Sequence, residues 1–311
     1  MGSFLVVCYK TQSSFSLRCY RLDRMHSGSL AIFLAALLEL SSLPVSRAAS
    51  SRFAVLDGHK IHYLSFGQGD RAVVFIHGWT CDSTFWKMQA PVYEKRRSLL
   101  IDLPGHGLSD KPEIPYTMEL FARAVNAVMT DAKVGPATLV GHSMGTPVAI
   151  EFLRLYPRRV AGLVIVDGFV PQPPNGDAER ETERRRKQLA YSFRGPDYKT
   201  AANRVLDFMF TEQTPPSLRE EITAKMLRVP QYVMASAMAG MTAMPLVTES
   251  WPKLPVAAMM VKRYNSTPYQ DFLKTHFHLV DYRDFEGAGH FLMLEQPDAV
   301  NGLLQRFLDR Q

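Results

Sequence analysis

The chain is poor in cysteine, with only Cys8, Cys19 and Cys81 in 311 residues. Their spacing matches neither a disulfide framework nor a metal-binding pattern, which excludes a disulfide-rich scaffold and a cysteine-ligated metal centre. Cys81 has no catalytic motif around it, so we expect a buried structural thiol rather than a nucleophile. We expect no metal ion and no organic cofactor.

Low-complexity tracts and internal repeats are also absent from the sequence. A largely disordered chain and a solenoid of repeats are therefore excluded. Hydrophobic residues make up 46% of the 311 positions, which is enough for one sizeable core, or for a core domain that carries an inserted subdomain.

A strong excess of one charge sign is missing as well. The formal net charge is +6, but residues 1–48 hold five basic and two acidic side chains, which leaves +3 for the remainder. The basic run at residues 184–187 follows several acidic residues, so we expect a solvated helix with paired charges. A polyanion site is the alternative, but no nucleic-acid motif accompanies the run, and we expect no nucleic-acid partner.

No apolar run reaches the length of a membrane span, which needs about 20 residues. Residues 30–38 (LAIFLAALL) form a shorter run, and small residues follow it up to Ala49. This pattern predicts a signal peptide that is cleaved near Ala48, with residues 1–24 as an extension before a start at Met25. We then expect a secreted or periplasmic protein without stable membrane insertion; a retained membrane anchor is the alternative.

Strand-like and helix-like segments alternate from residue 53 onward, a pattern typical of an α/β fold with a largely parallel sheet. The expected strands are 53–56, 60–66, 72–76, 98–101, 137–140, 160–166, 256–261 and 278–285, and the expected helices are 118–132, 146–155 and 297–308. Asp57-Gly58 predicts a hairpin between the first two strands.

This alternation stops after residue 168. Residues 171–176 (PQPPNG) form a turn-rich linker, and residues 177 to about 250 have helical character without a clear core strand. We therefore expect a helical cap at 169–253, inserted between two parts of an α/β core at 49–168 and 254–311.

The strongest motif is Gly141-His142-Ser143-Met144-Gly145, which matches G-x-S-x-G between an apolar strand and a helical segment. The glycines allow a sharp turn from strand to helix, and this turn lifts the serine hydroxyl above the sheet. There the helix N-terminus and the Met144 backbone N–H face any oxyanion that forms. The motif therefore predicts a nucleophilic Ser143.

A serine hydroxyl is a weak nucleophile at neutral pH and needs a neighbouring base. Among nine histidines the candidate is His290, in a Gly-Ala-Gly-His-Phe segment that follows the last expected strand. His77, His106 and His142 lie in loops, where we expect structural hydrogen bonds instead. We expect activity to fall in acid, as His290 becomes protonated.

Five segments, in the same order, resemble the α/β-hydrolase superfamily, in the group with a helical cap that includes esterases, lactonases and carbon–carbon bond hydrolases. They are His77-Gly78-Trp79, residues 102–110 (DLPGHGLSD), residues 141–145, Val166-Asp167-Gly168 and residues 287–297 (GAGHFLMLEQP). The resemblance implies an eight-stranded, mostly parallel sheet with helices on both faces, Ser143 as nucleophile and His290 as general base. It also implies an oxyanion hole from the N–H groups of Trp79 and Met144, and a structural loop at 102–110.

The triad acid departs from the superfamily's usual pattern. In most members it follows the strand expected here at 256–261, but residues 261–265 (VKRYN) contain no carboxylate. An acid near His290 is needed to hold the imidazole in the right tautomer. Asp167, at the end of the strand expected at 160–166, is the best substitute; Asp271 and the absence of any triad carboxylate are the alternatives.

The expected cap contains five methionines between residues 226 and 244. Helical core packing explains such a stripe, and the alternative is a malleable apolar lid over Ser143. The residues that we expect to contact substrate are Trp79, Phe169 and Met144. Such a pocket would suit hydrophobic acyl or aryl groups.

These residues predict a serine hydrolase that cleaves carboxylic esters of small molecules through an acyl-enzyme on Ser143. Lactonase, carbon–carbon bond hydrolase and cofactor-free perhydrolase activities are compatible with the same residues and stay open. Dehalogenase and epoxide hydrolase chemistry need Asp at the nucleophile position, so a serine at position 143 argues against both activities. A non-catalytic ligand receptor on the same fold is the alternative from another class. The sequence predicts no oligomeric state.

Overall fold

A computed structural model of the chain describes all residues except 1–4, 11–16, 23–48, 173–176 and 263–266. Two compact units are present, Met1–Ser46 and Arg47–Gln311. In the first unit, β1 (Leu5–Lys10) and β2 (Leu17–Leu22) pair antiparallel. The apolar run of the expected leader, at 30–38, lies outside the described residues. Within the described ranges, no helix has the length and apolar character needed to cross a membrane.

The second unit contains an eight-stranded sheet with the order β10-β9-β8-β7-β5-β6-β4-β3. Its strands are β3 (Ser50–Leu56), β4 (His59–Phe66), β5 (Ala72–Ile76), β6 (Ser98–Ile101), β7 (Ala137–His142), β8 (Val160–Val166), β9 (Trp251–Val261) and β10 (Phe277–Phe285). Neighbours pair parallel except β3 with β4 and β4 with β6. Every residue of β5, β6 and β7 is buried, which explains their apolar sequences, because a parallel strand is covered on both faces. The expected mostly parallel sheet and its hairpin are confirmed.

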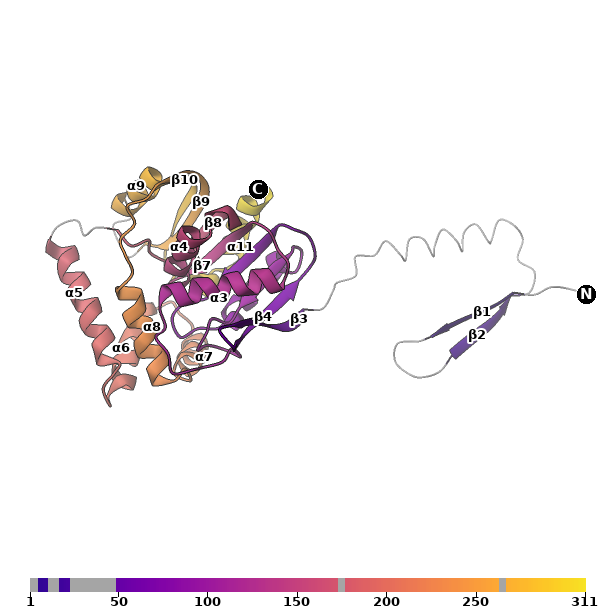
Figure 1. The fold of residues 1–311 in the computed structure, drawn as a ribbon, viewed down its shortest axis with the longest axis horizontal. Coiled ribbons are helices and arrows are strands. Elements are labelled where there is room, and N and C mark those ends of the chain that lie inside the picture. Colours follow the sequence, from indigo (N-terminus) through magenta and orange to yellow (C-terminus); the bar gives the residue numbers. More distant parts are fainter. Residues whose placement is uncertain (1–4, 11–16, 23–48, 173–176, 263–266) are drawn as a thin grey trace, which may run out of the picture. The chain divides into compact units, whose positions relative to one another are not determined.

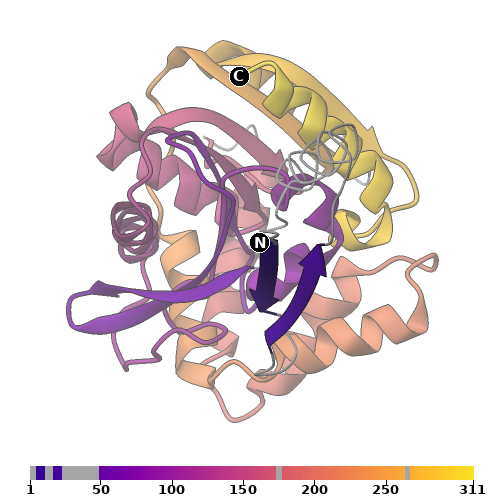
Figure 2. The ribbon, with the colours of Figure 1, turned by 90° about the vertical axis from the view of Figure 1, so that its right-hand side faces the viewer.

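Helices cover both faces of this sheet. α3 (Met118–Asp131) and α4 (Gly145–Leu155) pack against each other on one face, and α11 (Pro297–Asp309) lies on the other (Figure 2). The Phe307 ring of α11 packs over Gly162 of β8, where an added Cβ would lie 3.2 Å from the ring. The shorter helices of this unit are η1 (Ser83–Gln89), α2 (Ala90–Tyr93), η2 (Pro157–Arg159) and α10 (Leu292–Glu295).

Four helices form an insertion between β8 and β9 (Figure 1). They are α5 (Asp177–Ser192), α6 (Tyr198–Met209), α7 (Pro216–Met226) and α8 (Gln231–Thr242). β8 and β9 are parallel neighbours, so this helical insertion leaves and rejoins the sheet at adjacent strands. The expected helical character is confirmed. Four of its methionines, namely Met226, Met234, Met238 and Met244, are buried in the hydrophobic core, as helical core packing predicts.

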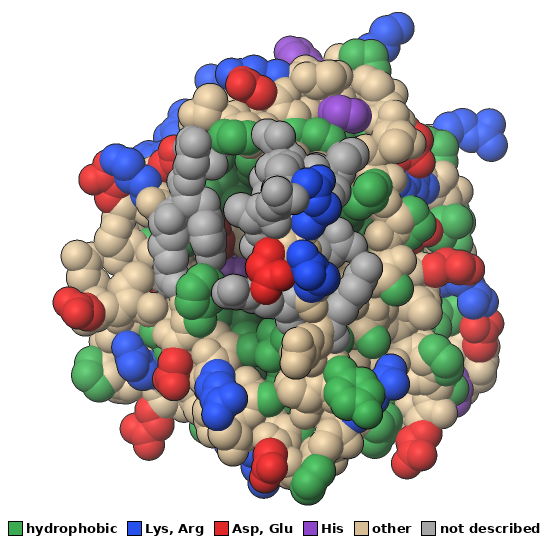
Figure 3. All heavy atoms as spheres, turned by 90° about the vertical axis from the view of Figure 1, so that its left-hand side faces the viewer, with side chains coloured by type: hydrophobic (Ala, Val, Ile, Leu, Met, Phe, Trp, Pro, Cys, Tyr) green, Lys and Arg blue, Asp and Glu red, His purple; other side chains and the backbone are tan. Residues whose placement is uncertain are grey.

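The face that carries the helical insertion has mixed charge. In Figure 3, Lys and Arg side chains are interspersed with Asp and Glu side chains over this face. Arg184, from the basic run, pairs with Glu181 at 3.5 Å on α5. The run lies in the helix α5, as expected, and this ion pair agrees with the expected pairing of charges for Arg184.

β9 begins at Trp251 and not at Val256, so the expected end of the cap falls inside a strand. Trp251 pairs with Phe277 of β10, and a register shift follows this pair. This part of the strand was not predicted because it contains Pro252 and Pro255, and proline cannot donate a hydrogen bond to a β ladder.

α9 (Thr267–His276), between β9 and β10, was not expected from the sequence. Leu273 is its one buried residue among those described. Tyr269 and Phe272 pack against the core beside it, so the apolar face of α9 is only about one turn long, which is too short a pattern to predict a helix from the sequence. Asp271 lies exposed on this helix and pairs with Lys274 at 3.4 Å.

Candidate active site

Ser143 lies at the turn between β7 and α4, at the carboxyl end of a central strand. Its φ is +50°, in the left-handed region that residues other than glycine rarely adopt. Its N–H donates to the Val166 carbonyl oxygen at 3.1 Å, and its own carbonyl oxygen accepts from the Thr146 N–H at 3.0 Å. These bonds hold the serine in a strained conformation directly before the helix.

The glycines around this turn leave no room for a side chain. A Cβ at Gly145 would collide with the Ile76 carbonyl oxygen, and one at Gly141 would lie 2.6 Å from the Gly145 carbonyl oxygen. A Cβ at Gly78 would lie 3.1 Å from the Cβ of Ser143. The Ser143 turn is therefore packed directly against the loop that follows β5.

His290 and Asp167 lie side by side, although 123 positions separate them in the sequence. The His290 Nδ1 and Asp167 Oδ2 atoms are 2.6 Å apart, and the two side chains are 17% and 7% exposed. The other Asp167 oxygen accepts from the Val261 N–H at 3.0 Å, and the Asp167 N–H donates to the Met259 carbonyl oxygen at 2.7 Å. These bonds hold the carboxylate firmly. Because Nδ1 of His290 contacts Asp167, Nε2 is the ring nitrogen that is left to contact another group.

The His290 backbone is held by two other parts of the chain. His142, next to Ser143, is fully buried, and its Nε2 donates to the His290 carbonyl oxygen at 2.9 Å. Burial lowers the pKa of His142 well below its ordinary value, which keeps this imidazole neutral. The His290 N–H donates to the carbonyl oxygen of Met209, at the end of α6, at 2.8 Å. The helical insertion therefore contacts the site directly.

The Nε2 atom of His290 is buried and has no hydrogen-bond partner in the part of the chain that the structure describes. It therefore makes no hydrogen bond with the Ser143 hydroxyl. The bond between a base and its nucleophile is often long without substrate and tightens in the reacting complex. Nε2 thus remains available to accept a proton from a hydroxyl.

Two backbone N–H groups flank the Ser143 turn. Trp79 follows Gly78 in the adjoining loop, and Met144 follows the serine at the start of α4. Both residues are buried, yet among the described residues neither N–H donates a hydrogen bond to a protein acceptor. Buried N–H groups are nearly always paired. Two unpaired ones beside a serine are therefore suited to bind a negatively charged oxygen.

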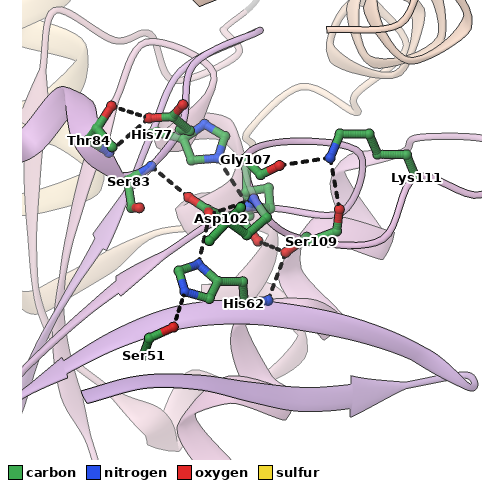
Figure 4. A network of polar contacts seen from close by, with 12 residues as sticks. Ser51, His62, His77, Ser83, Thr84, Asp102, Gly107, Ser109 and Lys111 are labelled. Atoms are coloured by element: carbon green, nitrogen blue, oxygen red, sulfur yellow. Dashed lines mark hydrogen bonds and ion pairs between the residues drawn. The ribbon is translucent and has the colours of Figure 1, made fainter. Parts of the chain in front are cut away.

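The loop between β6 and α3 is organised by Asp102 (Figure 4). This carboxylate accepts from His62 Nδ1 at 2.8 Å, from the Ser83 N–H at 2.7 Å and from the Leu108 N–H at 2.9 Å. Burial alone would raise the pKa of Asp102, but these hydrogen bonds outweigh burial and lower the pKa to about 2. Asp102 is therefore an ionised structural centre of its loop, as expected.

Three histidines around the site bond only to backbone groups. His77 accepts from the Leu103 N–H at 3.0 Å and donates to the Gly78 carbonyl oxygen at 2.8 Å, which ties two loops together. His106 donates to the Pro104 carbonyl oxygen at 2.9 Å, and burial lowers its pKa to about 3. Burial lowers the pKa of His77 too. The structural hydrogen bonds expected for these imidazoles, including His142, are confirmed.

The thiol of Cys81 is buried, and burial raises its pKa well above the ordinary value. A thiol becomes a nucleophile as the thiolate, which this environment disfavours. The expected structural role for Cys81 is therefore supported.

The three residues expected to contact substrate differ in exposure. Met144 is fully buried, and Trp79 is 3% exposed, with its indole N–H donating to the Met234 carbonyl oxygen in α8 at 2.9 Å. Phe169 is partly exposed in the segment after Asp167. Trp79 thus joins the helical insertion to the Ser143 turn, and Phe169 is the one of the three that reaches solvent.

A surface cavity of about 550 Å³ lies against α7. Its lining residues are Glu212, Thr214, Pro216, Arg219, Glu220, Thr223 and Ala224. None of the residues predicted to act on substrate is among them, so we do not assign this cavity to the Ser143 site.

Tyr269 of α9 supports the site, and this role was not predicted from the sequence. Its hydroxyl oxygen accepts from the Val170 N–H at 3.1 Å and donates to the Gly168 carbonyl oxygen at 3.3 Å. These bonds anchor the segment that follows Asp167. The alternative acid, Asp271, lies exposed on the same helix, so the structure brings Asp167 and not Asp271 to the imidazole.

Residues 73–303 match the family model that is described as the alpha/beta hydrolase family. The chain belongs to the alpha/beta hydrolase family. The matched range includes the Ser143 turn, Asp167, the helical insertion and His290.

Similar curated proteins include two hydrolases of the same name and one acetyltransferase component. The chain is 34% identical over 148 residues to a 2-hydroxy-6-oxononadienedioate/2-hydroxy-6-oxononatrienedioate hydrolase of Burkholderia vietnamiensis, which covers 42% of this chain and 51% of that protein. It is 31% identical over 154 residues to the Escherichia coli K12 protein of the same name, with 44% and 54% covered. It is 34% identical over 120 residues to the dihydrolipoyllysine-residue acetyltransferase component of the acetoin cleaving system of Cupriavidus necator, with 38% and 32% covered. The chain thus spans about half, or less, of the length of these relatives.

Solved structures match over most of the chain. Est816, described as an N-acyl homoserine lactone degrading enzyme, has a TM-score of 0.69 and 26% identity, with 82% of this chain and all of that chain covered. An esterase of Exiguobacterium antarcticum has a TM-score of 0.72 and 20% identity, with 84% and 100% covered. An esterase of Thermogutta terrifontis has a TM-score of 0.71 and 23% identity, with 85% and 98% covered. At these identities, the two esterases support the shared fold alone.

Proposed function

We propose that this chain is a serine hydrolase that cleaves carboxylic esters of hydrophobic acyl or aryl groups through an acyl-enzyme on Ser143. The observation that carries the proposal is the 2.6 Å contact between Asp167 and His290, next to the strained Ser143 turn. Membership of the alpha/beta hydrolase family supports it.

In the proposed reaction, the Ser143 Oγ attacks the ester carbonyl carbon while His290 Nε2 takes the hydroxyl proton. The N–H groups of Trp79 and Met144 bind the negative charge that develops on the carbonyl oxygen. His290 then gives the proton to the departing alcohol, and the acyl group stays on Ser143. A water molecule, activated by the same imidazole, releases the acid and restores the hydroxyl.

Asp167 is the proposed triad acid. As a carboxylate it accepts the Nδ1 proton of His290, which leaves Nε2 unprotonated and able to act as a base. The same contact stabilises the imidazolium that forms during proton transfer. The Val261 N–H bond to the second oxygen supports this role, because it fixes the direction of the carboxylate.

We assign the helical insertion as a cap over the site. The bond from the Trp79 indole to Met234 and the bond from the His290 N–H to Met209 support this assignment. Phe193 of the segment after α5 lies with its ring 5.0 Å from the Trp79 ring. Together with Phe169 and Met144, Trp79 would then give the substrate an apolar surrounding.

Cleavage of a carbon–carbon bond next to a carbonyl group is the second candidate. Two relatives, at 34% and 31% identity, are named as hydrolases of 2-hydroxy-6-oxononadienedioate and 2-hydroxy-6-oxononatrienedioate, which supports this candidate. Lactone cleavage has the support of one structural neighbour at 26% identity. Both reactions would use the same nucleophile, base and oxyanion donors. A non-catalytic ligand receptor would have the same site residues but would bind its ligand without converting it.

A series of p-nitrophenyl esters of increasing acyl length tests the proposal. We expect the purified chain to release p-nitrophenol, with kcat/KM rising for apolar acyl groups. We expect Ser143→Ala to lose activity by a factor on the order of 10⁶, since the nucleophile acts as a unit with its base. Ser250→Ala, which removes an exposed hydroxyl elsewhere, is the matched control and should retain full activity.

Turnover that survives in folded Ser143→Ala would overturn Ser143 as the nucleophile. Turnover of lactones or vinylogous diketones, with no ester cleaved, would replace the ester proposal by one of the second candidates. If the folded wild-type chain binds these compounds and converts none of them, the receptor is the better description.

A further inference from the structure

A second serine, histidine and aspartate form a hydrogen-bonded row at the β3–β4 edge of the sheet. The Ser51 Oγ is 2.9 Å from His62 Nε2, and His62 Nδ1 is 2.8 Å from Asp102 Oδ2 (Figure 4). Ser51 lies on β3, His62 on β4 and Asp102 directly after β6. None of these residues belongs to the Ser143 site.

The direction of each bond in this row follows from Asp102. Its pKa of about 2 keeps it ionised, and a carboxylate can only accept hydrogen bonds. His62 Nδ1 must therefore carry the proton between these two groups. In the neutral imidazole, Nε2 is then unprotonated, so the Ser51 hydroxyl is the donor and Nε2 the acceptor. This is the arrangement of a hydroxyl next to its general base.

Asp102 also holds the imidazole in place. It accepts from the Ser83 and Leu108 N–H groups besides His62, so its orientation is over-determined. The side chains of His62 and Asp102 are each 3% exposed. A buried base with a fixed ring has little freedom to turn away from the hydroxyl that it contacts.

Ser51 itself is exposed, and apolar side chains lie beside it. β3 is the edge strand of the sheet, and residues two apart on a strand share a face. Phe53, 47% exposed, and Val55, 65% exposed, therefore extend the face that carries Ser51. The Phe53 ring lies 5.2 Å from the His62 ring. An apolar acyl or aryl group can thus be seated next to the hydroxyl.

We propose that Ser51 is a second nucleophilic hydroxyl, which accepts acyl groups from activated, hydrophobic carboxylic esters. The Ser51 Oγ forms a bond to the acyl carbon, the bond from that carbon to the leaving aryl oxygen breaks, and the hydroxyl proton passes to His62 Nε2 and from there to the aryl oxide. The products are O-acyl-Ser51 and a phenol. The reaction is a single acyl transfer and needs no second reactant.

This inference does not depend on Ser143. The test therefore uses Ser143→Ala, in which the proposed turnover site is silent, as the parent protein. It is incubated with a p-nitrophenyl ester of a medium-chain fatty acid, and peptide mass spectrometry locates and times the added acyl groups. We expect one acyl group on the peptide that carries Ser51, formed in step with p-nitrophenol release.

Three further variants in this parent separate a general-base role from simple exposure. Ser51→Ala should remove the adduct. His62→Asn, whose amide nitrogen can still donate to Asp102, should slow acylation by a factor on the order of 100, because the base is lost. Ser50→Ala is the matched control: Ser50 is the exposed neighbour on β3 whose hydroxyl bonds to the Ser65 carbonyl oxygen, and its loss should leave the rate unchanged. Circular dichroism and the Tm confirm that each variant is folded.

Two results would overturn the proposal. One is an absence of acyl-Ser51 in the folded parent, or acylation of Ser51 no faster than that of other exposed serines. The other is an unchanged rate in folded His62→Asn, which would mean that exposure alone governs the reaction. Either result leaves the Ser143 proposal untouched, because that site is tested by turnover in the wild-type chain.

Discussion

Ser143 and Ser51 both lie close to an imidazole that a carboxylate holds, but the backbone beneath them differs. Ser143 lies on a turn with φ +50°, at the start of α4 and beside the N–H groups of Trp79 and Met144, which have no protein acceptor among the described residues. Ser51 lies within the edge strand β3, which has no helix N-terminus at that position. We therefore expect the three side chains alone to be insufficient for turnover. In the two proposals, the N–H donors for an oxyanion distinguish the Ser143 site, which would hydrolyse, from the Ser51 hydroxyl, which would only be acylated.

The carboxylates of Asp167 and Asp102 also differ in the number of groups that they hold in place. Asp167 accepts one imidazole bond and one backbone bond. Asp102 accepts two backbone bonds besides the imidazole and organises the loop that follows β6. Loss of the Asp167 charge should therefore affect chemistry more than folding, whereas disturbance of Asp102 should affect folding first.

Among the changes that compare the two carboxylates and their surroundings, Asp167→Asn should have the largest effect. Asparagine keeps the shape but no longer favours the Nδ1–H tautomer of His290, so kcat for ester cleavage should fall by about 10⁴ while the Tm changes little. Steady-state kinetics and thermal unfolding measure the two quantities. Asp271→Asn, an exposed carboxylate on α9, is the control and should retain kcat. The reverse pattern would remove Asp167 from the triad.

The next effect concerns three buried histidines that bond only to backbone groups, namely His77, His106 and His142. Burial lowers their folded-state pKa values, to about 3 for His106, whereas the unfolded chain binds protons near the ordinary value of about 6.5. As pH falls below about 6.5, the unfolded state takes up protons that the folded state does not, so stability decreases. The three groups together should lower the free energy of unfolding by up to about 4 kcal/mol per pH unit.

Urea unfolding at a series of pH values measures this slope. Replacement of the exposed His278 by glutamine should leave it unchanged. A free energy of unfolding that stays constant between about pH 6 and pH 4 would contradict the burial of neutral imidazoles.

The smallest effect is expected at Gly107, which touches Asp102. Gly107 has φ +49°, and an added Cβ would collide with the Asp102 carboxylate. Gly107→Ala should lower the free energy of unfolding by about 3 kcal/mol, from backbone strain and overpacking together. Gly58→Ala is the matched control, since Gly58 has φ +83° but open space around its Cβ position. Gly58→Ala should lower the free energy of unfolding by about 1 kcal/mol, from backbone strain alone. Equal costs for the two variants would show that the Asp102 contact is unimportant.

Local signals were enough to predict the core of this fold. Apolar runs and glycine-bearing loops predicted β5, β6 and β8 at their observed bounds. The α9 helix was not predicted, because its apolar face of Tyr269, Phe272 and Leu273 is only about one turn long. The start of β9 was not predicted, because its two prolines are unfavourable in a strand. Tertiary pairing with β10 outweighed that local preference.

Local sequence is enough to specify the Ser143 turn, because a G-x-S-x-G segment between a strand and a helix fixes its own backbone geometry. Which groups meet that turn was decided by the tertiary structure. Asp167 and His290 are 123 positions apart, and Ser51 lies on β3 whereas Asp102 directly follows β6 of the same sheet. Contacts of this kind follow from strand order and register, which no local pattern encodes. The Trp79 and Met144 N–H groups were expected from the sequence, whereas the row from Ser51 to Asp102 became visible only in the folded chain.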